Sequence, residues 1–449
     1  MKKLPDDFLK NMKSLLSQED YEQFLADSGK DCFRGIRVNT LKCSVEKCRS
    51  FLPFLGEKTP FCGKSFYIPF DTEAIGDEPF HHAGAFYVQE PSAACAVEVL
   101  DVQRGDKVLD LCAAPGGKST QIAAELGGSG LLWCNEFVKS RANILLSNIE
   151  RMGVTNAVVS SCHPDTLCSR IEGYFDKVLV DAPCSGEGMF RKDESAVSHW
   201  SQEHSLSCAE RQLSILNSAA KALKNGGTLV YSTCTFSRCE NEGVIERFLE
   251  THSDFELVES KAGFGRTAME KAVRILPADG GEGHFAAKLK KLGQLERYPE
   301  AVTRQPDFTE KKAALKLYGE IFKSRVFGDN MQKIGDKIIL LPNIELPQLG
   351  GLGVLRAGIL FGEIKKNRVE PCHALFMAAK KEDLNSFVEL GYSDSRLKNY
   401  YHGEEIRIPD GLKGFSAVLV EGVSTGFGKA SSGVLKNRYP KGLRSNNHS

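Results

Sequence analysis

From residue 105 to residue 290, short apolar runs alternate with longer segments that repeat apolar residues at helical spacing. The apolar runs have the length and composition of buried strands. This alternation predicts an α/β fold, in which a mostly parallel sheet carries helices on both faces. The predicted strands are 107–112, 130–135, 157–161, 176–181, 227–233 and 255–258, and the predicted helices are 118–126, 138–151, 206–223 and 240–251.

The pattern changes at the end of this stretch. An apolar run at 274–277 is followed by a glycine-rich turn at 279–283 and by a second run at 284–289. Two such runs joined by a short turn with glycine are typical of a β-hairpin. We therefore expect an antiparallel strand at the edge of the parallel sheet.

Shorter elements precede this stretch. Helical periodicity at 7–24 and strand signals at 35–39 and 65–68 predict a small α+β unit. Residues 81–92 are interpreted as a link from this unit to a helix at 93–100.

Short strands and turns dominate after residue 331, with a flexible turn expected at 426–429 and a basic end. A polar, Lys-rich stretch before residue 331 is typical of a linker with a helix. The predicted domains are an α+β N-terminal domain (1–80), a central α/β domain (81–292), a linker with a helical segment (293–330) and a β-rich extension (331–449).

Composition adds a charge asymmetry. The 449 residues are 41% hydrophobic and 26% charged, as in ordinary globular proteins, and the formal net charge is zero. However, residues 301–449 carry 23 basic against 16 acidic side chains, a net charge of +7, which leaves −7 for residues 1–300. This asymmetry favours a polyanionic partner held by the C-terminal part, although a chance surface bias gives the same numbers.

The sequence also argues against several classes of protein. The fourteen cysteines include no Cys-x-x-Cys pair, so we expect no metal site. The first residues lack the apolar core of a signal peptide, and no run approaches the roughly twenty apolar residues of a transmembrane helix. We expect a cytoplasmic protein with reduced thiols, no membrane contact and no required oligomer.

A glycine turn follows the first strand of the central domain and indicates a nucleotide-type site. Residues 110–118 contain Gly116 and Gly117 but lack the Gly-x-Gly-x-x-Gly pattern of dinucleotide folds. Glycine lets a backbone approach a ligand closely, and the helix that follows offers free N–H groups. Glu136 ends the next strand, where a carboxylate suits a ribose diol. Loop and acid fit S-adenosylmethionine at least as well as NAD.

Two cysteines follow later strands of the same sheet. Cys184, in Asp-Ala-Pro-Cys-Ser-Gly-Glu-Gly, comes after the strand at 176–181, and Cys234 comes after the strand at 227–233. Because ligands of open α/β sheets bind at the carboxyl ends of the strands, both thiols are expected at the ligand site. Two thiols in such a site indicate covalent chemistry on an electrophilic substrate.

Together, residues 112–118, 181–188 and 232–235 resemble the motifs of the Nop/Sun (NSUN) family of RNA 5-methylcytosine methyltransferases, in the order of that family. The terminal stretch 436–444 resembles the PUA-like extension of the bacterial, RsmF-like branch that acts on rRNA. The resemblance is strong over 80–290 and weaker at both ends. It implies a Rossmann-like S-adenosylmethionine methyltransferase domain, with an N-terminal α+β domain and a PUA-like C-terminal domain that bind RNA.

The resemblance also implies roles for individual residues. Glu136 would bind the ribose, and Asp181 would face both the cofactor and the base. Asp165 is the acid near the place where the family contacts adenine, although its surroundings depart from the family pattern; a helix N-cap is the alternative reading. The loop that would wrap the methionine and ribose part consists of Cys112, Ala113, Ala114, Pro115, Gly116, Gly117 and Lys118.

The expected chemistry begins with addition of a thiolate to carbon 6 of cytosine, which makes carbon 5 nucleophilic. An acid is needed at N3 of the ring, and the sequence places Asp181 for it. The local Pro-Cys pattern favours Cys184 as the nucleophile. The family resemblance implies instead that Cys234 attacks and that Cys184 assists release of the methylated RNA.

These observations predict an S-adenosylmethionine-dependent RNA cytosine-5 methyltransferase that acts on small-subunit rRNA. Two alternatives remain open: a tRNA cytosine-5 methyltransferase, and a weakly catalytic RNA-binding factor in ribosome assembly. A DNA methyltransferase is disfavoured, because it would have no use for the second cysteine, Cys234.

Overall fold

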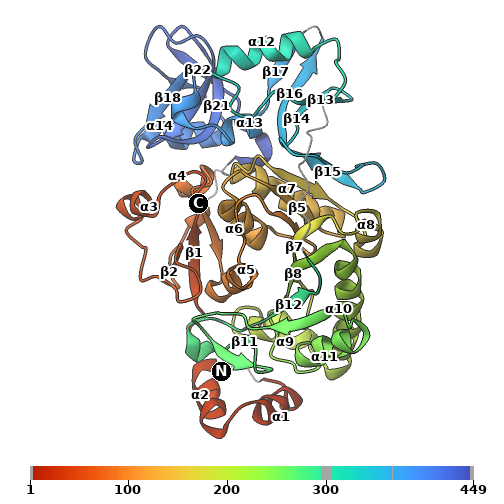
Figure 1. Ribbon diagram of the computed structural model, residues 1–449. Helices are drawn as coiled ribbons and strands as arrows, with labels where there is room; N and C mark the ends of the chain where they lie inside the picture. Colours follow the sequence, from red (N-terminus) through yellow and green to blue (C-terminus); the bar gives the residue numbers. More distant parts are fainter. Residues whose placement is uncertain (1–3, 295–304, 367, 445–449) are drawn as a thin grey trace.

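The alternating segments build a Rossmann-like sheet between helices in the computed structural model, which describes residues 4–294, 305–366 and 368–444 (Figure 1). Most of the predicted strands and helices lie within two residues of the observed ones. The elements of this part are α5 (Cys95–Leu100), β4 (Lys107–Asp110), α6 (Gly117–Leu126), β5 (Leu131–Asn135), α7 (Lys139–Arg151), β6 (Ala157–Ser160), α8 (Pro164–Arg170), β7 (Phe175–Asp181), α9 (Glu194–His199), α10 (Gln202–Ala222), β8 (Leu223–Thr233), α11 (Glu242–Thr251), β9 (Phe255–Val258), β10 (Arg266–Ala268), β11 (Ala272–Ile275) and β12 (His284–Lys291).

The strand order places a ligand site at the end of β4. Within the described residues, a ten-stranded sheet has the path β10-β11-β12-β8-β7-β4-β5-β6-β15, where β15 spans Val354–Ala357, and β9 pairs with β12. Along this path, the neighbouring strands β6, β5, β4, β7 and β8 run parallel to one another. The chain leaves β4 toward β5 on one side and returns to β7 on the other, and open α/β sheets bind ligands at such a switch point.

The edges of this sheet differ from the prediction. The hairpin prediction is confirmed, since β11 and β12 pair antiparallel. The prediction of an edge position was wrong: β12 lies between β8 and β11, and β10 pairs onto β11. The other edge is closed by β15, which comes from the region after residue 331 and pairs antiparallel with β6.

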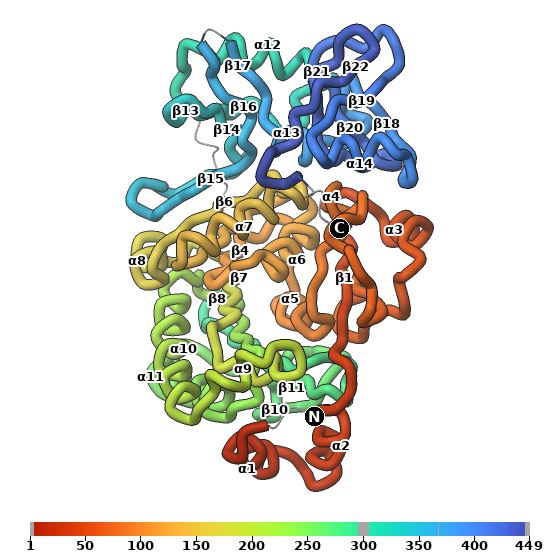
Figure 2. The backbone as a smooth tube through the Cα atoms, turned by 180° about the vertical axis from the view of Figure 1, so that it is seen from behind, coloured from red at the N-terminus to blue at the C-terminus, as the bar shows by residue number. Residues whose placement is uncertain are grey.

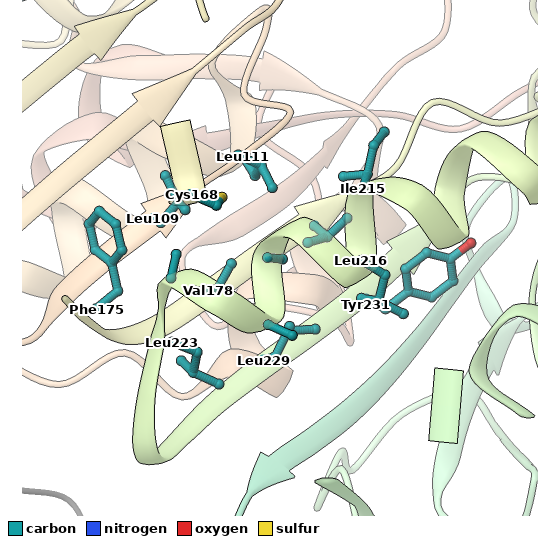
Figure 3. Packing of buried hydrophobic residues seen from close by; sticks show 14 of the residues in the cluster. Leu109, Leu111, Cys168, Phe175, Val178, Ile215, Leu216, Leu223, Leu229 and Tyr231 are labelled. Atoms are coloured by element: carbon teal, nitrogen blue, oxygen red, sulfur yellow. The ribbon is translucent and has the colours of Figure 1, made fainter. Parts of the chain in front are cut away.

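The central part has one hydrophobic core between the sheet and helix α10, and a second between the other face of the sheet and helices α5, α6 and α7. Side chains of β4, β7 and β8, among them Leu109, Val178 and Leu229, are fully buried against Leu216 of α10 (Figure 3). Burying each such side chain stabilises the fold by about 1.5–3 kcal/mol. This packing fixes the carboxyl ends of β4, β7 and β8 relative to one another.

The N-terminal part contains two helices where one was predicted over 7–24. The second helix begins after Ser17, whose side chain accepts a hydrogen bond from the backbone N of Asp20, as an N-cap does. Residues 86–89, predicted as part of a link, form a third strand that pairs with the strand β1 (Arg34–Val38). The elements are α1 (Asp6–Leu15), α2 (Gln18–Ser28), β1 (Arg34–Val38), α3 (Val45–Phe51), β2 (Ser65–Ile68), α4 (Pro79–His82) and β3 (Phe86–Gln89).

The C-terminal part is rich in strands, as predicted, and has a four-stranded and a five-stranded sheet within the described residues. Residues 295–304 of the predicted linker lie outside the described residues, and α12 forms in its second half. The elements are α12 (Lys311–Ile321), β13 (Met331–Ile334), β14 (Lys337–Leu340), β16 (Ile359–Lys365), β17 (Arg368–Pro371), α13 (His373–Met377), β18 (Phe387–Leu390), α14 (Ser395–His402), β19 (Ile406–Arg407), β20 (Gly414–Val420), β21 (Val423–Ser431) and β22 (Val434–Asn437).

The flexible turn predicted at 426–429 is wrong, because these residues lie inside β21, between β20 and β22. The glycines serve close packing there. A Cβ on Gly426 would lie 2.5 Å from the hydroxyl of Tyr400, and Gly426 has a φ of +152°. Glycine inside a strand is typical of a close approach by another group.

The N-terminal sheet, with α3 and α4 beside it, and the last sheet of the chain share one hydrophobic core. Ile36 and Phe80 of the N-terminal part pack in the same cluster as Tyr400 and Val418 of the last part. Figure 2 shows these parts side by side, with α1 and α2 at the opposite end of the molecule. Two strands cross the predicted domain limits: β3 follows residue 80 but joins the N-terminal sheet, and β15 follows residue 331 but joins the central sheet. The domain limits themselves remain a prediction. No helix within the described residues is long and apolar enough to cross a membrane.

Candidate active site

Three loops meet at the carboxyl edge of the sheet, after β4, β7 and β8. Lys118, from the loop after β4, forms an ion pair with Asp181 at the end of β7, with a distance of 2.7 Å between Nζ and Oδ2. The other carboxylate oxygen of Asp181 accepts a hydrogen bond of 2.8 Å from the hydroxyl of Ser232 on β8. Cys234 acts electrostatically on Lys118, and Cys184 contacts Cys234, so the predicted residues Lys118, Asp181, Cys184 and Cys234 come together in one place.

The carboxylate of Asp181 is held in its charged form. Burial disfavours the charge, but Lys118 and His284 outweigh that cost and bring the pKa of Asp181 below its ordinary value of 3.8. Nε2 of His284, on β12, lies 3.9 Å from Oδ1 of Asp181. Asp181 in the free protein therefore accepts hydrogen bonds, whereas the sequence-based mechanism asks it to donate a proton.

The two thiols of the site are in contact. Sγ of Cys184 and Sγ of Cys234 lie 3.3 Å apart, and both cysteines are free and partly exposed. The hydrogen bond to Cys234 and burial together raise the pKa of the Cys184 thiol well above its ordinary value. The raised pKa favours the protonated form of Cys184, and in this contact its S–H group can donate toward Cys234.

The glycines of the cofactor loop serve packing inside the protein as well as the approach of a ligand. Gly116 has a φ of +115°, which favours glycine, and a Cβ on Gly117 would lie 3.3 Å from the ring of Tyr87. Gly117 therefore makes room for the ring of Tyr87, a role in packing that adds to the expected role of the glycines in ligand approach. Cys112 packs against the main core, and burial raises its pKa.

A buried carboxyl group lies beneath this loop. Oδ2 of Asp110 accepts a hydrogen bond of 2.6 Å from Ser119, whereas Oδ1 has no hydrogen-bond partner in the described structure. Burial raises the pKa of Asp110 to about 7. Buried polar atoms are rarely left without a partner, so Oδ1 is a ready acceptor for a ligand group in the loop.

Glu136 stands at the end of β5, as the sequence predicts, and is 5% exposed. One carboxylate oxygen accepts a hydrogen bond from the backbone N of Val138, at 2.9 Å, and the other lies 3.2 Å from the guanidinium of Arg141. Both contacts hold the carboxylate in one orientation at the same edge as β4.

Asp165 does not join this group. Its side chain is 56% exposed and pairs with Lys221 of α10, at 2.8 Å. The alternative interpretation of Asp165 as an N-cap is wrong, because His163 caps α8 and its side chain accepts a hydrogen bond from the backbone N of Asp165. The ring of His163 lies instead 5.4 Å from the exposed ring of Phe137. A contact of Asp165 with adenine stays a prediction.

The roles of some residues near the site were missed in the sequence. Arg37 on β1 is 1% exposed and donates to the carbonyl of Gly117, at 3.0 Å, and to the hydroxyl of Thr120, at 2.8 Å. It therefore ties the N-terminal sheet to the cofactor loop, and only the tertiary structure reveals this. Glu187 and Glu240, both buried behind the thiols, were missed as well. In the described part of the chain, no cluster of three or more His, Cys, Asp or Glu residues could hold a metal ion.

Comparisons with known proteins agree with this geometry. The family model for 16S rRNA methyltransferase RsmB/F matches residues 97–290, and models for the N-terminal, first C-terminal and PUA domains of RsmF match 4–91, 316–378 and 387–445. A ribosomal RNA small subunit methyltransferase F of Vibrio campbellii is 35% identical, covering 98% of this chain and 97% of the relative.

Two further similarities extend the comparison. A ribosomal RNA small subunit methyltransferase F of Vibrio parahaemolyticus is 36% identical, with coverage of 98% of this chain and 97% of the relative. The crystal structure of a methyltransferase homologue from Pyrococcus horikoshii has a TM-score of 0.54 and 28% identity, over 64% of this chain and all of that one. The chain thus belongs to the RsmF family of 16S rRNA methyltransferases.

Proposed function

We propose that this protein methylates carbon 5 of a cytosine in small-subunit rRNA, with S-adenosylmethionine as the methyl donor. The observation that carries the proposal is the pair of thiols, 3.3 Å apart, at the same sheet edge as Asp181 and the glycine loop. The names of the relatives support rRNA as the substrate. The net charge of +7 over residues 301–449 fits a polyanionic partner.

The residues at the end of β4 and β5 fit S-adenosylmethionine. Oδ1 of Asp110 is a buried acceptor without a partner, and Glu136 presents a fixed carboxylate at the next strand. We assign the methionine and ribose part to the loop of residues 112–118 and the ribose hydroxyls to Glu136. For the adenine end, Asp165 remains a prediction, and the exposed ring of Phe137 is a second surface. Bound S-adenosylmethionine supplies an electrophilic methyl group.

The thiol pair supports Cys234 as the nucleophile. The pKa of Cys184 is raised, which favours its thiol form, and in this scheme its S–H group donates toward the attacking sulfur of Cys234. The Cys234 thiolate adds to carbon 6 of cytosine, and carbon 5 becomes nucleophilic. After methyl transfer a base takes the proton from carbon 5, the bond between Cys234 and carbon 6 breaks, and Cys184 assists this release.

In this scheme Asp181 first binds the cytosine as a hydrogen-bond acceptor and then acts as an acid. Its carboxylate, fixed by Lys118 and Ser232, is a hydrogen-bond acceptor that suits the exocyclic amine of cytosine. When the cytosine enters the pocket it excludes water, and loss of water raises the pKa of a carboxyl group such as that of Asp181. Proton uptake by Asp181 then provides the hydrogen bond to N3 that the addition requires.

The test is transfer of a labelled methyl group from S-adenosylmethionine to purified 16S rRNA, 30S subunits, total tRNA and DNA, followed by digestion to nucleosides. The proposal predicts label in 5-methylcytidine from 16S rRNA or 30S subunits. Label in tRNA alone would assign a different substrate. Absence of label from every acceptor, with S-adenosylmethionine shown to bind, would support the weakly catalytic RNA-binding factor instead.

A further inference from the structure

The two loops that carry the thiols hold each other through a reciprocal pair of glutamates. Glu187 follows Cys184 in the chain, and its Oε2 accepts a hydrogen bond of 2.9 Å from the backbone N of Phe236, beyond Cys234. Glu240 follows Cys234, and its Oε2 accepts a hydrogen bond of 2.9 Å from the backbone N of Ser185, next to Cys184. Each loop thus contributes one carboxylate to the backbone of the other.

Further contacts complete this brace, which consists of Glu187, Glu240 and the backbone groups they bind. The hydroxyl of Ser185 donates to Oε1 of Glu240, at 2.5 Å. The backbone N of Gly188 donates to the carbonyl of Cys234 itself, at 2.9 Å. Behind the loops, the indole of Trp200 donates to Oε1 of Glu187, at 2.9 Å. Every carboxylate oxygen of the two glutamates is therefore bound.

The brace has an electrostatic cost that a purely structural contact would not need. Glu187 is 3% exposed, Glu240 is fully buried, and neither forms an ion pair with a Lys or Arg among the described residues. Burial raises the pKa of Glu187 to about 7 and that of Glu240 above its ordinary value. Apolar residues would fill such positions without this cost, but they would not orient the backbone beside the thiols.

We propose that Glu187 and Glu240 are positioning residues that fix the distance between the two thiols. This distance lets Cys184 assist release of the RNA after Cys234 has attacked the cytosine. This inference rests on the proposed two-thiol mechanism. Each loop is anchored one or two residues from its cysteine, so a shift of either loop would separate the two sulfur atoms. The brace touches neither the glycine loop nor Glu136, so it acts on the thiols and leaves the cofactor contacts in place.

A measurement on the thiols tests the brace without any assay of methyl transfer. The full-length protein is equilibrated in buffers of oxidised and reduced dithiothreitol, quenched, and mapped by mass spectrometry for the disulfide between Cys184 and Cys234. The variants are Glu187→Gln and Glu240→Gln. Glu242→Gln is the matched control, since Glu242 is also buried and pairs with Arg274 at 2.6 Å, but its carboxylate has no hydrogen bond or ion pair with the thiol loops among the described residues.

The other close thiol pair provides an internal reference. Sγ of Cys43 and Sγ of Cys48 lie 3.4 Å apart in the N-terminal part, outside the brace. Each brace variant should lower the equilibrium constant for the Cys184–Cys234 disulfide by about tenfold, the effect of one lost hydrogen bond. In the brace variants, the disulfide constant of the Cys43–Cys48 pair should stay within about twofold of its wild-type value. In the Glu242→Gln control, the Cys184–Cys234 disulfide constant should also stay within about twofold, because this variant loses no bond of the brace.

Methyl transfer gives a second readout. The brace variants should lower kcat by about tenfold, with KM values for RNA and S-adenosylmethionine within about twofold of the wild type, because each loses one hydrogen bond beside the thiols and none at the cofactor loop. An unchanged or raised disulfide constant in both variants would overturn the inference, even if the wild type methylates rRNA. A wild type without methyl transfer, but with the expected disulfide constants, would reject the proposed function and leave the brace established.

Discussion

Replacement of Lys118 by Met tests the electrostatics of the site most simply. Met keeps most of the aliphatic stem of the side chain and removes the ammonium that lies 2.7 Å from Asp181. The side chains are 13% and 29% exposed, so the pair is only partly shielded from water. Breaking a fully buried pair costs about 3–5 kcal/mol, and the partial exposure of Asp181 reduces our expectation to about 2 kcal/mol of unfolding free energy.

The assay is a double-mutant cycle in urea, with Lys118→Met, Asp181→Asn and the combined variant. Because the two side chains are in contact, the double variant should be more stable than the sum of the single effects predicts, with a coupling of about 2 kcal/mol. Additive effects, within about 0.5 kcal/mol, would refute the claim that Lys118 holds Asp181 in its charged form.

The same variant has a pH signature. The pKa of Asp181 is lowered in the folded protein, so the ion pair stabilises the fold above the ordinary value of 3.8 and loses this effect as the pH falls through the folded pKa. The difference in unfolding free energy between wild type and Lys118→Met should therefore be constant near neutral pH and shrink below pH 3.8. A difference that grows on acidification would contradict the sign of the shift.

Three further predictions concern other parts of the molecule. Arg37→Met should weaken binding of S-adenosylmethionine about tenfold in calorimetry, because Gly117 loses its anchor; unchanged affinity would separate the N-terminal sheet from the cofactor loop. The pKa of Glu187 is raised to about 7, so the wild type should lose about 3 kcal/mol of stability relative to Glu187→Gln between pH 4.5 and 7; parallel pH profiles in urea would refute this. Gly426→Ala should cost about 2 kcal/mol of unfolding free energy or more, because its Cβ would meet Tyr400; a neutral effect would mean that β21 adapts.

The parallel sheet could be predicted because its strands are buried on both faces and therefore form continuous apolar runs. The runs that became β5, β6 and β9 were placed to within one residue. The same pattern brings the residues after β4, β7 and β8 to one edge, which is why Lys118, Asp181 and both thiols were found together.

The failures have local and tertiary causes. The break between α1 and α2 was present in the sequence as Ser17 followed by Asp20, a capping signal that the apolar periodicity concealed. The glycines of β21 were interpreted as a turn because the groups that require them lie outside the segment: Tyr400 of α14 approaches Gly426, and Leu435 of β22 approaches Gly428. The same holds for Arg37 and the two glutamates of the brace, whose partners are distant in the chain or reached only when two loops meet.

The central claim is that two thiols share one reaction, and one comparison tests it most directly. Wild type, Cys234→Ala and Cys184→Ala are incubated with rRNA and S-adenosylmethionine, and protein–RNA adducts that survive denaturation are quantified beside methyl transfer. We predict that Cys234→Ala shows neither transfer nor adduct, while Cys184→Ala accumulates the adduct. Adduct formation by Cys234→Ala, together with its loss in Cys184→Ala, would reverse the roles of the two thiols and contradict the account.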